Sequence, residues 1–162
     1  MNKPVDEPEE PTDHFYDRLN LDVSYMPAMW GAFTVGHLLG IDLNRVCRLH
    51  GLSIADVNAI GALRDGKQLR ATDLARRLHV SNAVLSPRVA KLEKRGFLMR
   101  IHSTADRRAF ELKLTPKGTE LIEAAITDIS RHARFVRSFL RLSEQDRKDL
   151  ARIMGALVKH ME

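Results

Sequence analysis

The sequence predicts a mainly α-helical fold that carries one small β-hairpin. Apolar residues recur at spacings of three and four over most of the 162 residues, which is the period of an amphipathic helix. One stretch, residues 97–114, instead alternates with a period of two, as a pair of strands does. Polar residues that start helices and glycines that end them divide the helical part into several elements.

The first 13 residues, MNKPVDEPEEPTD, differ from the rest in composition. They hold five acidic residues, one lysine and three of the six prolines, although the whole chain has a net charge of +5. Segments of this composition cannot bury enough apolar surface to fold. Residues 1–13 are therefore predicted to be a disordered acidic tail.

The next segment, residues 14–52, is predicted to be helical. Pro27 suits the first position of a helix, and Gly51 suits the cap at its C-terminal end. The stretch between them is too apolar to be solvated on all sides. It must therefore pack against another part of the fold or against another chain.

Residues 53–115 are predicted to form a small domain of three helices and a hairpin. Ser53 and Asp56 match the Ser-x-x-acid pattern that starts a helix. A short helix is expected around residues 71–78, with its leucines on the inner face. A turn at residues 79–81 then leads into the next helix.

That next helix is expected to start at Asn82, with Ser81 as its cap, and to end near Gly96. Its core-facing positions follow from the helical period. They are Val84, Leu85, Val89 and Leu92.

The C-terminal segment, residues 116–162, is predicted to be helical again. Thr115 is expected to cap its first helix, with Pro116 at the first helical position, and Ser143 is expected to open the last one. Apolar residues between them follow a 4-3-4-3-4 spacing, which is a heptad seam. They are Ile122, Ile126, Ile129, Ala133, Val136 and Leu140. Since the two terminal segments expose more apolar surface than a small domain can cover, we expect this seam to form a dimer interface, with internal core as the alternative.

A short helix, a tight turn, a second helix and a hairpin together make a winged helix-turn-helix. The predicted fold class is thus a winged helix-turn-helix plus a helical dimerisation layer. Residues 64–108 hold twelve Lys and Arg against four Asp and Glu, which indicates a surface for a polyanion such as double-stranded DNA. The alternative is an ordinary solvated basic face.

The helix after the turn is the predicted recognition helix, because its polar side chains lie off the apolar face and can reach base edges or phosphates. Its predicted contact residues are Ser81, Asn82, Ala83, Ser86, Pro87, Arg88 and Lys91. In the hairpin tip, Arg108 is predicted to enter the minor groove, with Asp106 holding its guanidinium and Arg107 on a phosphate. The alternative there is a type I turn with solvated arginines.

The run LRATDLARRLHVSNAVLSPRVAKLEKRGFLMRIHSTADRRAFELKLTPKG, with GLSIADVNAIGALRDG before it, resembles the MarR (multiple-antibiotic-resistance regulator) family over about residues 25–160. The resemblance implies a homodimeric repressor that binds a pseudo-palindromic operator, with both terminal helical segments in the dimer interface. It also implies a small-molecule effector between that layer and the winged helix. Three positions depart from the family pattern: His79 in the turn, Ala83, and Pro87 inside the recognition helix.

A ligand site is a further hypothesis. Trp30, Phe33 and His37 follow one helical face and could line a pocket for an aromatic ligand, with Arg64 as a partner for an anionic group. Core packing is the alternative use of these aromatic residues. The sequence does not identify the effector, the operator or the sign of regulation.

Other classes of function have little support in the sequence. No nucleophile–base pair, paired carboxylates or phosphate-binding glycine loop appears, so we expect no enzyme and no cofactor. The histidines lack metal-ligand spacing, and the single cysteine, Cys47, is expected to be a buried small hydrophobe in a cytoplasmic protein. No run of 18 apolar residues predicts a membrane span. The main competitor is a winged-helix protein–protein interaction module without DNA readout.

Overall fold

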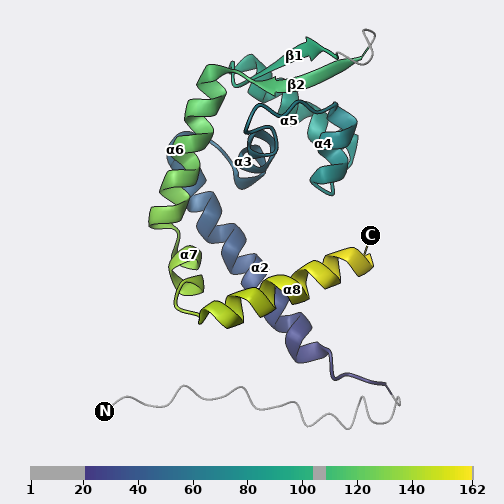
Figure 1. The fold of residues 1–162 in the computed structure, drawn as a ribbon, viewed down its shortest axis with the longest axis vertical. Coiled ribbons are helices and arrows are strands. Elements are labelled where there is room, and N and C mark those ends of the chain that lie inside the picture. Colours follow the sequence, from purple (N-terminus) through teal and green to yellow (C-terminus); the bar gives the residue numbers. More distant parts are fainter. Residues whose placement is uncertain (1–20, 104–108, 162) are drawn as a thin grey trace. The chain divides into compact units, whose positions relative to one another are not determined.

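The computed structural model describes residues 21–103 and 109–161 (Figure 1). The chain divides into two compact units, residues 1–37 and 38–162. The predicted acidic tail, residues 1–13, and the predicted wing contacts at 106–108 lie outside the described residues. Within the described ranges, no helix is both long enough and apolar enough to cross a membrane.

The described part is mainly helical, with one two-stranded antiparallel sheet, so the predicted fold class is confirmed for its winged helix. The elements in chain order are α2 (Met26–Cys47), η1 (Arg48–His50), α3 (Ile54–Gly61), α4 (Ala71–Arg77), α5 (Asn82–Lys94), β1 (Leu98–His102), β2 (Phe110–Leu114), α6 (Pro116–His132), α7 (Arg134–Phe139) and α8 (Glu144–Met161).

The core of the second unit lies where α3, α4, α5, the hairpin and α6 meet. Its largest fully buried side chains include Ile60, Leu63, Leu74, Leu92 and Ile122. Cys47, at the end of α2, is also fully buried in this core, as the sequence predicted, and its burial raises the pKa of the thiol. Each helix of the winged domain therefore contributes a narrow apolar stripe and leaves its polar side at the surface.

Local capping chemistry sets the helix ends, largely as predicted. Ser53 and Asp56 form a reciprocal capping box at the start of α3. Thr115 caps α6 by accepting a hydrogen bond from the Gly118 N–H. Gly51 and Gly96 both have positive φ values of 64° and 75° and end η1 and α5, a geometry that glycine adopts without strain.

The hairpin is fixed at its base to both neighbouring helices. β1 and β2 pair from Leu98 opposite Leu114 to His102 opposite Phe110. The Thr115 hydroxyl donates to the Gly96 carbonyl at 2.7 Å, and the Thr115 N–H donates to the Phe97 carbonyl at 3.1 Å. The end of α5, the start of β1 and the start of α6 are thus joined through one threonine.

The turn between α4 and α5 uses a left-handed residue that is not glycine. His79 has a φ of 52°, and the following Val80 N–H donates to the Ala75 carbonyl at 3.1 Å. This is the Schellman pattern, in which the left-handed position usually holds glycine or asparagine. The departure noted at His79 therefore corresponds to a strained backbone position.

One predicted core residue is wrong. Val84 is 55% exposed, whereas Leu85, Val89 and Leu92 are buried. The three buried residues are spaced by four and three and define the core stripe of α5. Val84 precedes Leu85 by one residue, which turns its side chain about 100° away from that stripe.

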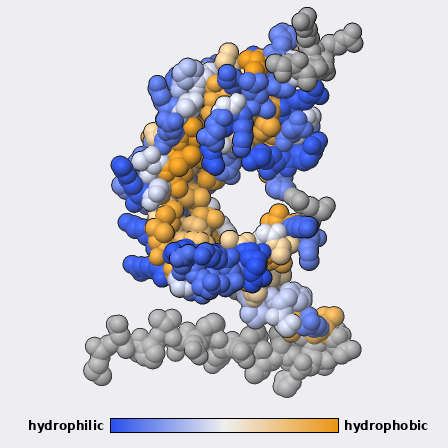
Figure 2. Space-filling model, in the orientation of Figure 1, coloured by the Kyte–Doolittle hydropathy of each residue, from blue (hydrophilic) through white to orange (hydrophobic). Residues whose placement is uncertain are grey.

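The predicted continuous heptad helix is also wrong. α6 ends at His132, Ala133 adopts an extended backbone with a ψ of 127°, and α7 starts at Arg134. Ile122 lies in the chain's own core at 2% exposure, while Ile126 is 40% exposed (Figure 2 shows hydrophobic surface along α6). The seam is therefore divided between internal core and surface, and the break ends its register.

Two side chains of α2 hold the break between α6 and α7. The Asp42 carboxylate accepts a hydrogen bond from the Phe135 N–H at 2.9 Å, at the start of α7. Arg45 donates to the His132 carbonyl and to Asp42, both at 3.0 Å. Burial acts to raise the pKa of Asp42, but the hydrogen bonds from Phe135 and Arg45 outweigh it and hold this pKa below its ordinary value.

Replacing Asp42 with alanine is expected to destabilise the protein at neutral pH by about 1–2 kcal/mol, the usual cost of losing a helix cap. Because the folded pKa is depressed, the carboxylate stabilises the fold above about pH 4 and loses this effect as the pH falls through its lowered value. Urea unfolding of both proteins at several pH values should therefore show a difference that shrinks in acid. The control is Asp149→Ala, which removes an exposed pair with Arg152 and should change the stability by less than about 0.5 kcal/mol.

Helix α8 exposes an apolar face. None of its residues is buried, and five of its large hydrophobic residues are 40–86% exposed. They are Ile153, Met154, Leu157, Val158 and Met161. A contiguous apolar surface of this kind is typical of an interaction site.

Candidate nucleic-acid interface

The predicted recognition helix, α5, presents its polar side to solvent. Ser81 caps it by accepting from the Val84 N–H. Six of the seven predicted contact residues are exposed: Ser81, Asn82, Ala83, Ser86, Pro87 and Lys91. The structure therefore brings these six together along the first three turns of one helix, on the side away from the core.

Pro87 lies inside α5 without ending it. Proline has no N–H for the carbonyl four residues earlier, which here belongs to Ala83. Since Ala83 is exposed, water can satisfy that carbonyl. The Ser86 hydroxyl also donates back to the Asn82 carbonyl at 2.7 Å, so the serine side chain turns along the helix.

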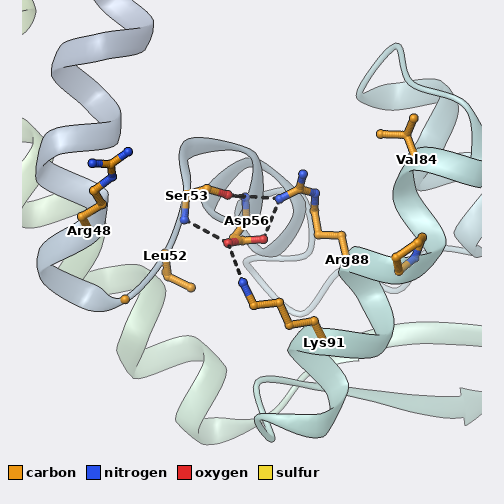
Figure 3. A pocket seen from close by; sticks show the side chains of 9 residues that line it. Arg48, Leu52, Ser53, Asp56, Val84, Arg88 and Lys91 are labelled. Atoms are coloured by element: carbon orange, nitrogen blue, oxygen red, sulfur yellow. Dashed lines mark hydrogen bonds and ion pairs between the residues drawn. The ribbon is translucent and has the colours of Figure 1, made fainter.

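Arg88, the seventh predicted contact, behaves differently. Its Nη1 lies 2.7 Å from Oδ1 of Asp56 and 3.1 Å from Oγ of Ser53, both at the start of α3 (Figure 3). Its side chain is 26% exposed and that of Asp56 is 3% exposed. The guanidinium is therefore already bound within the protein, and its predicted contact with DNA stays a prediction.

Asp56 is a buried, fully partnered carboxylate. One oxygen accepts from the Ser53 N–H at 2.9 Å, and the Lys91 ammonium lies 4.0 Å away. Burial acts to raise the pKa of Asp56, but hydrogen bonds from Ser53 and Arg88 and the charge of Arg88 outweigh it, so this pKa is lowered. Asp56 is consequently charged at neutral pH.

A shallow cavity of about 450 Å³ opens beside this ion pair. In Figure 3, Arg88 and Lys91 extend from α5 toward Asp56, and Val84 extends from the same helix. The cavity is lined by Arg48, Gly51, Leu52, Ser53, Asp56, Val84, Pro87, Arg88 and Lys91. Val84 lines this cavity, which opens to solvent, and its side chain is therefore exposed.

Helix α5 is held at its far end by a second arginine. Nη1 of Arg95 donates to the Gly51 carbonyl at 2.9 Å, and the guanidinium lies 4.7 Å from the centre of the Phe97 ring. Arg95 follows Arg88 by seven residues, which places both on the same side of the helix. Both therefore attach α5 to the segment that joins η1 to α3.

The wing can be followed to both sides of its tip. The Ser103 N–H donates to the Ala109 carbonyl at 2.9 Å, and the rings of His102 and Phe110 lie 4.5 Å apart. Asp106, Arg107 and Arg108 lie outside the described residues, so their roles stay predictions.

The residues of the predicted ligand site fall in different units. Trp30 and Phe33 stack on each other at 5.6 Å and are both 67% exposed, in the first unit together with His37. Arg64, in the second unit, lines a cavity of about 420 Å³ whose other walls include Val57, Ile122 and further isoleucines. The proposed grouping of all four residues stays a prediction.

The part of the chain that carries this geometry, residues 54–110, matches the model of the MarR family. Residues 54–110 form a MarR-family domain. The chain is similar to the HTH-type transcriptional regulator PecS of Dickeya dadantii, with 26% identity over 90% of this chain and 88% of PecS.

Solved structures of other proteins share the fold of this chain. AbsC, a MarR family transcriptional regulator from Streptomyces coelicolor, has 23% identity and a TM-score of 0.73 over 87% of this chain and 96% of AbsC. The transcriptional repressor CouR, solved on a 23-mer DNA duplex, has 22% identity and a TM-score of 0.68 over 86% of this chain and 98% of CouR. The family assignment and the winged helix-turn-helix fold therefore agree.

The partners of Arg88 could not be predicted from the sequence. Ser53 and Asp56 were recognised only as the start of a helix, because that pattern is local. Their contact with Arg88 joins residues 32 and 35 positions apart and leaves no periodic signal. A buried acid paired across two helices is visible only once the helices are packed.

Proposed function

We propose that this protein is a sequence-specific DNA-binding transcriptional regulator that acts as a homodimer. The observation that carries the proposal is the row of exposed small and polar side chains on α5, at the recognition position of a helix-turn-helix in a MarR-family domain. Such a helix fits the major groove. The regulatory role of PecS and the DNA complex of CouR support the same function.

Two copies are needed to read a two-fold symmetric operator. The exposed apolar face of α8 supports self-association, and paired recognition helices would contact half-sites about 34–36 Å apart. The competing function, a protein–protein module without DNA readout, is not favoured by the relatives, which are named as transcriptional regulators.

The proposed sign of regulation is repression, relieved by a small aromatic or anionic ligand. The cavity beside Arg64 supports this part, because it combines apolar walls with cations from Arg64, Lys67 and Arg77. The single buried, unpaired cysteine supports a cytoplasmic location.

Selection of bound duplexes from a random pool tests the proposed function. We expect enrichment of a pseudo-palindromic sequence, and repeating the selection with aromatic acids present should reduce its recovery. Affinity for the selected duplex should fall steeply with salt, since several phosphates are neutralised. Absence of any enriched duplex, or binding that is insensitive to salt, would reject a DNA-binding regulator.

Replacing Arg108 with alanine is expected to weaken binding to the selected duplex by about 1–3 kcal/mol, the usual value of a specific arginine contact. The lost affinity should come from contacts with base pairs at the edges of the operator, where a wing reaches the minor groove. Anisotropy titrations with edge-substituted duplexes would measure it. Arg137→Ala, on α7, is the matched control and should bind as the parent does.

A further inference from the structure

We propose that Asp56 and Arg88 are positioning residues for DNA recognition: the pair fastens the recognition helix to the start of α3, and Arg88 does not itself contact DNA. This inference rests on the proposed function, because it assigns how α5 is aimed at the groove. It replaces the interpretation of Arg88 as a base or phosphate contact.

The Arg88 guanidinium is held in a fixed direction by two acceptors. Its guanidinium makes two short contacts, 2.7 Å to Asp56 and 3.1 Å to Ser53, and both acceptors lie at the N-terminus of α3 (Figure 3). A guanidinium held by a carboxylate and a hydroxyl at once has a fixed direction. Arg88 is also the one residue of the seven predicted contacts that is not exposed.

The burial of Asp56 also keeps Arg88 in place. Its side chain is 3% exposed, so if Arg88 turned toward DNA, the buried carboxylate would keep the hydrogen bond from the Ser53 N–H, but its nearest cation would be the Lys91 ammonium, 4.0 Å away. Leaving a buried charge without its partner is strongly unfavourable. Lys91, whose side chain is 61% exposed, can reach a phosphate without this cost.

The recognition helix is attached at a second point, at its C-terminal end. Arg95, two turns after Arg88, donates to the Gly51 carbonyl at 2.9 Å. Both arginines therefore bind the short segment between η1 and the first turn of α3, one at the middle of α5 and one at its end. Two contacts along one side of a helix fix the direction of the helix axis, whereas a single contact would let the helix rotate about that point.

The test compares Arg88→Gln and Asp56→Asn with the parent protein. Anisotropy titrations use the selected duplex and a scrambled duplex of the same length, each at several salt concentrations. For Arg88→Gln we expect affinity for the selected duplex to fall by about 5- to 150-fold, the usual range for coupling between separate sites. The slope of log K against log salt should stay at the parent's value, because no phosphate contact is lost.

Asp56→Asn should make the slope of log K against log salt steeper, whereas the loss of a phosphate contact would make it shallower. Asparagine can still accept from the Ser53 N–H, but it releases Arg88 from its ion pair. The freed cation should strengthen binding to the scrambled duplex and steepen its salt slope by up to about 0.9 per protomer, while binding to the selected duplex weakens. The ratio of the two affinities should therefore fall.

A shallower slope for Arg88→Gln, by about 0.9 per protomer, would assign Arg88 to a phosphate and overturn the inference. Unchanged affinity of Arg88→Gln for the selected duplex would overturn it as well. A parent protein that binds no duplex rejects the proposed function itself, which is a different result from either of these.

Arg88→Lys keeps the inference testable if the glutamine variant does not fold, which circular dichroism would reveal. Lysine can pair with Asp56 but cannot hold Ser53 in the same fixed geometry. We expect weaker binding to the selected duplex at the parent's salt slope. If Arg88 served a phosphate, the lysine charge would preserve both the affinity and the slope, and that result would overturn the inference.

Discussion

Replacing Gly118 with alanine is expected to destabilise the fold by about 3 kcal/mol or more, at the upper end of overpacking effects. Gly118 is buried in the first turn of α6, and a Cβ there would lie 2.1 Å from the Phe97 carbonyl oxygen. No side chain can move to relieve this contact, because the nearest atoms all belong to the Phe97 backbone. That carbonyl also accepts the Thr115 N–H, so moving it would break a hydrogen bond at the base of the hairpin.

Chemical denaturation followed by circular dichroism would measure this loss. The matched control is Gly61→Ala, at the end of α3, where the added Cβ meets only Cδ1 of Ile122 at 3.8 Å. Since alanine favours helix over glycine, the control should be neutral or stabilising by up to about 1 kcal/mol. A Gly118→Ala protein as stable as its parent would show that the end of α5 and the start of α6 are not held as tightly as described.

Replacing Leu157 with glutamate is expected to convert the proposed homodimer to monomers and to weaken operator binding by about 100-fold or more. Leu157 is 51% exposed at the centre of the apolar face of α8. A charge buried there on association would have no partner in the other copy. A monomer would contact one half-site, so the gain from binding two linked half-sites, about 10²–10⁴, would be lost.

Analytical ultracentrifugation would report the oligomeric state and anisotropy the affinity. Lys159→Glu is the matched control, because Lys159 lies on the opposite side of α8 and the change places the same side chain in solvent. We expect this control to remain dimeric. If Leu157→Glu stayed dimeric at micromolar concentration, the α8 face would not be the interface.

The elements of the winged helix could be predicted because their signals are local. Ser53 with Asp56 and Thr115 with Pro116 mark helix starts within four residues, and Gly96 marks an end by its left-handed backbone. The period-two pattern likewise predicted the two strands of the hairpin, which pair from Leu98 opposite Leu114 onward. None of these depends on how distant parts of the chain pack.

The features that were predicted wrongly, or not predicted, depend instead on how distant parts of the chain pack. The heptad spacing across Ala133 is favourable for a helix, but Asp42, 93 residues before Phe135, stabilises a new helix start there. Helical periodicity could not tell Val84 from Leu85, since the two are adjacent and only packing decides the centre of the stripe. The buried pair of Asp56 and Arg88 likewise arises from helix packing, so no local pattern could predict it.

The threonine that joins the hairpin to α6 has a mechanical consequence. Thr115 forms hydrogen bonds with the backbone of both Gly96 and Phe97, so the strands and the first turn of α6 are expected to move together as one rigid body. A small tilt of α6 would be multiplied along the strands and displace Ser103 and Ala109, at their outer ends, by a greater distance. Any force along the axis of α6 would in this way shift the outer ends of the strands, and through Gly96 it would also act on the end of α5.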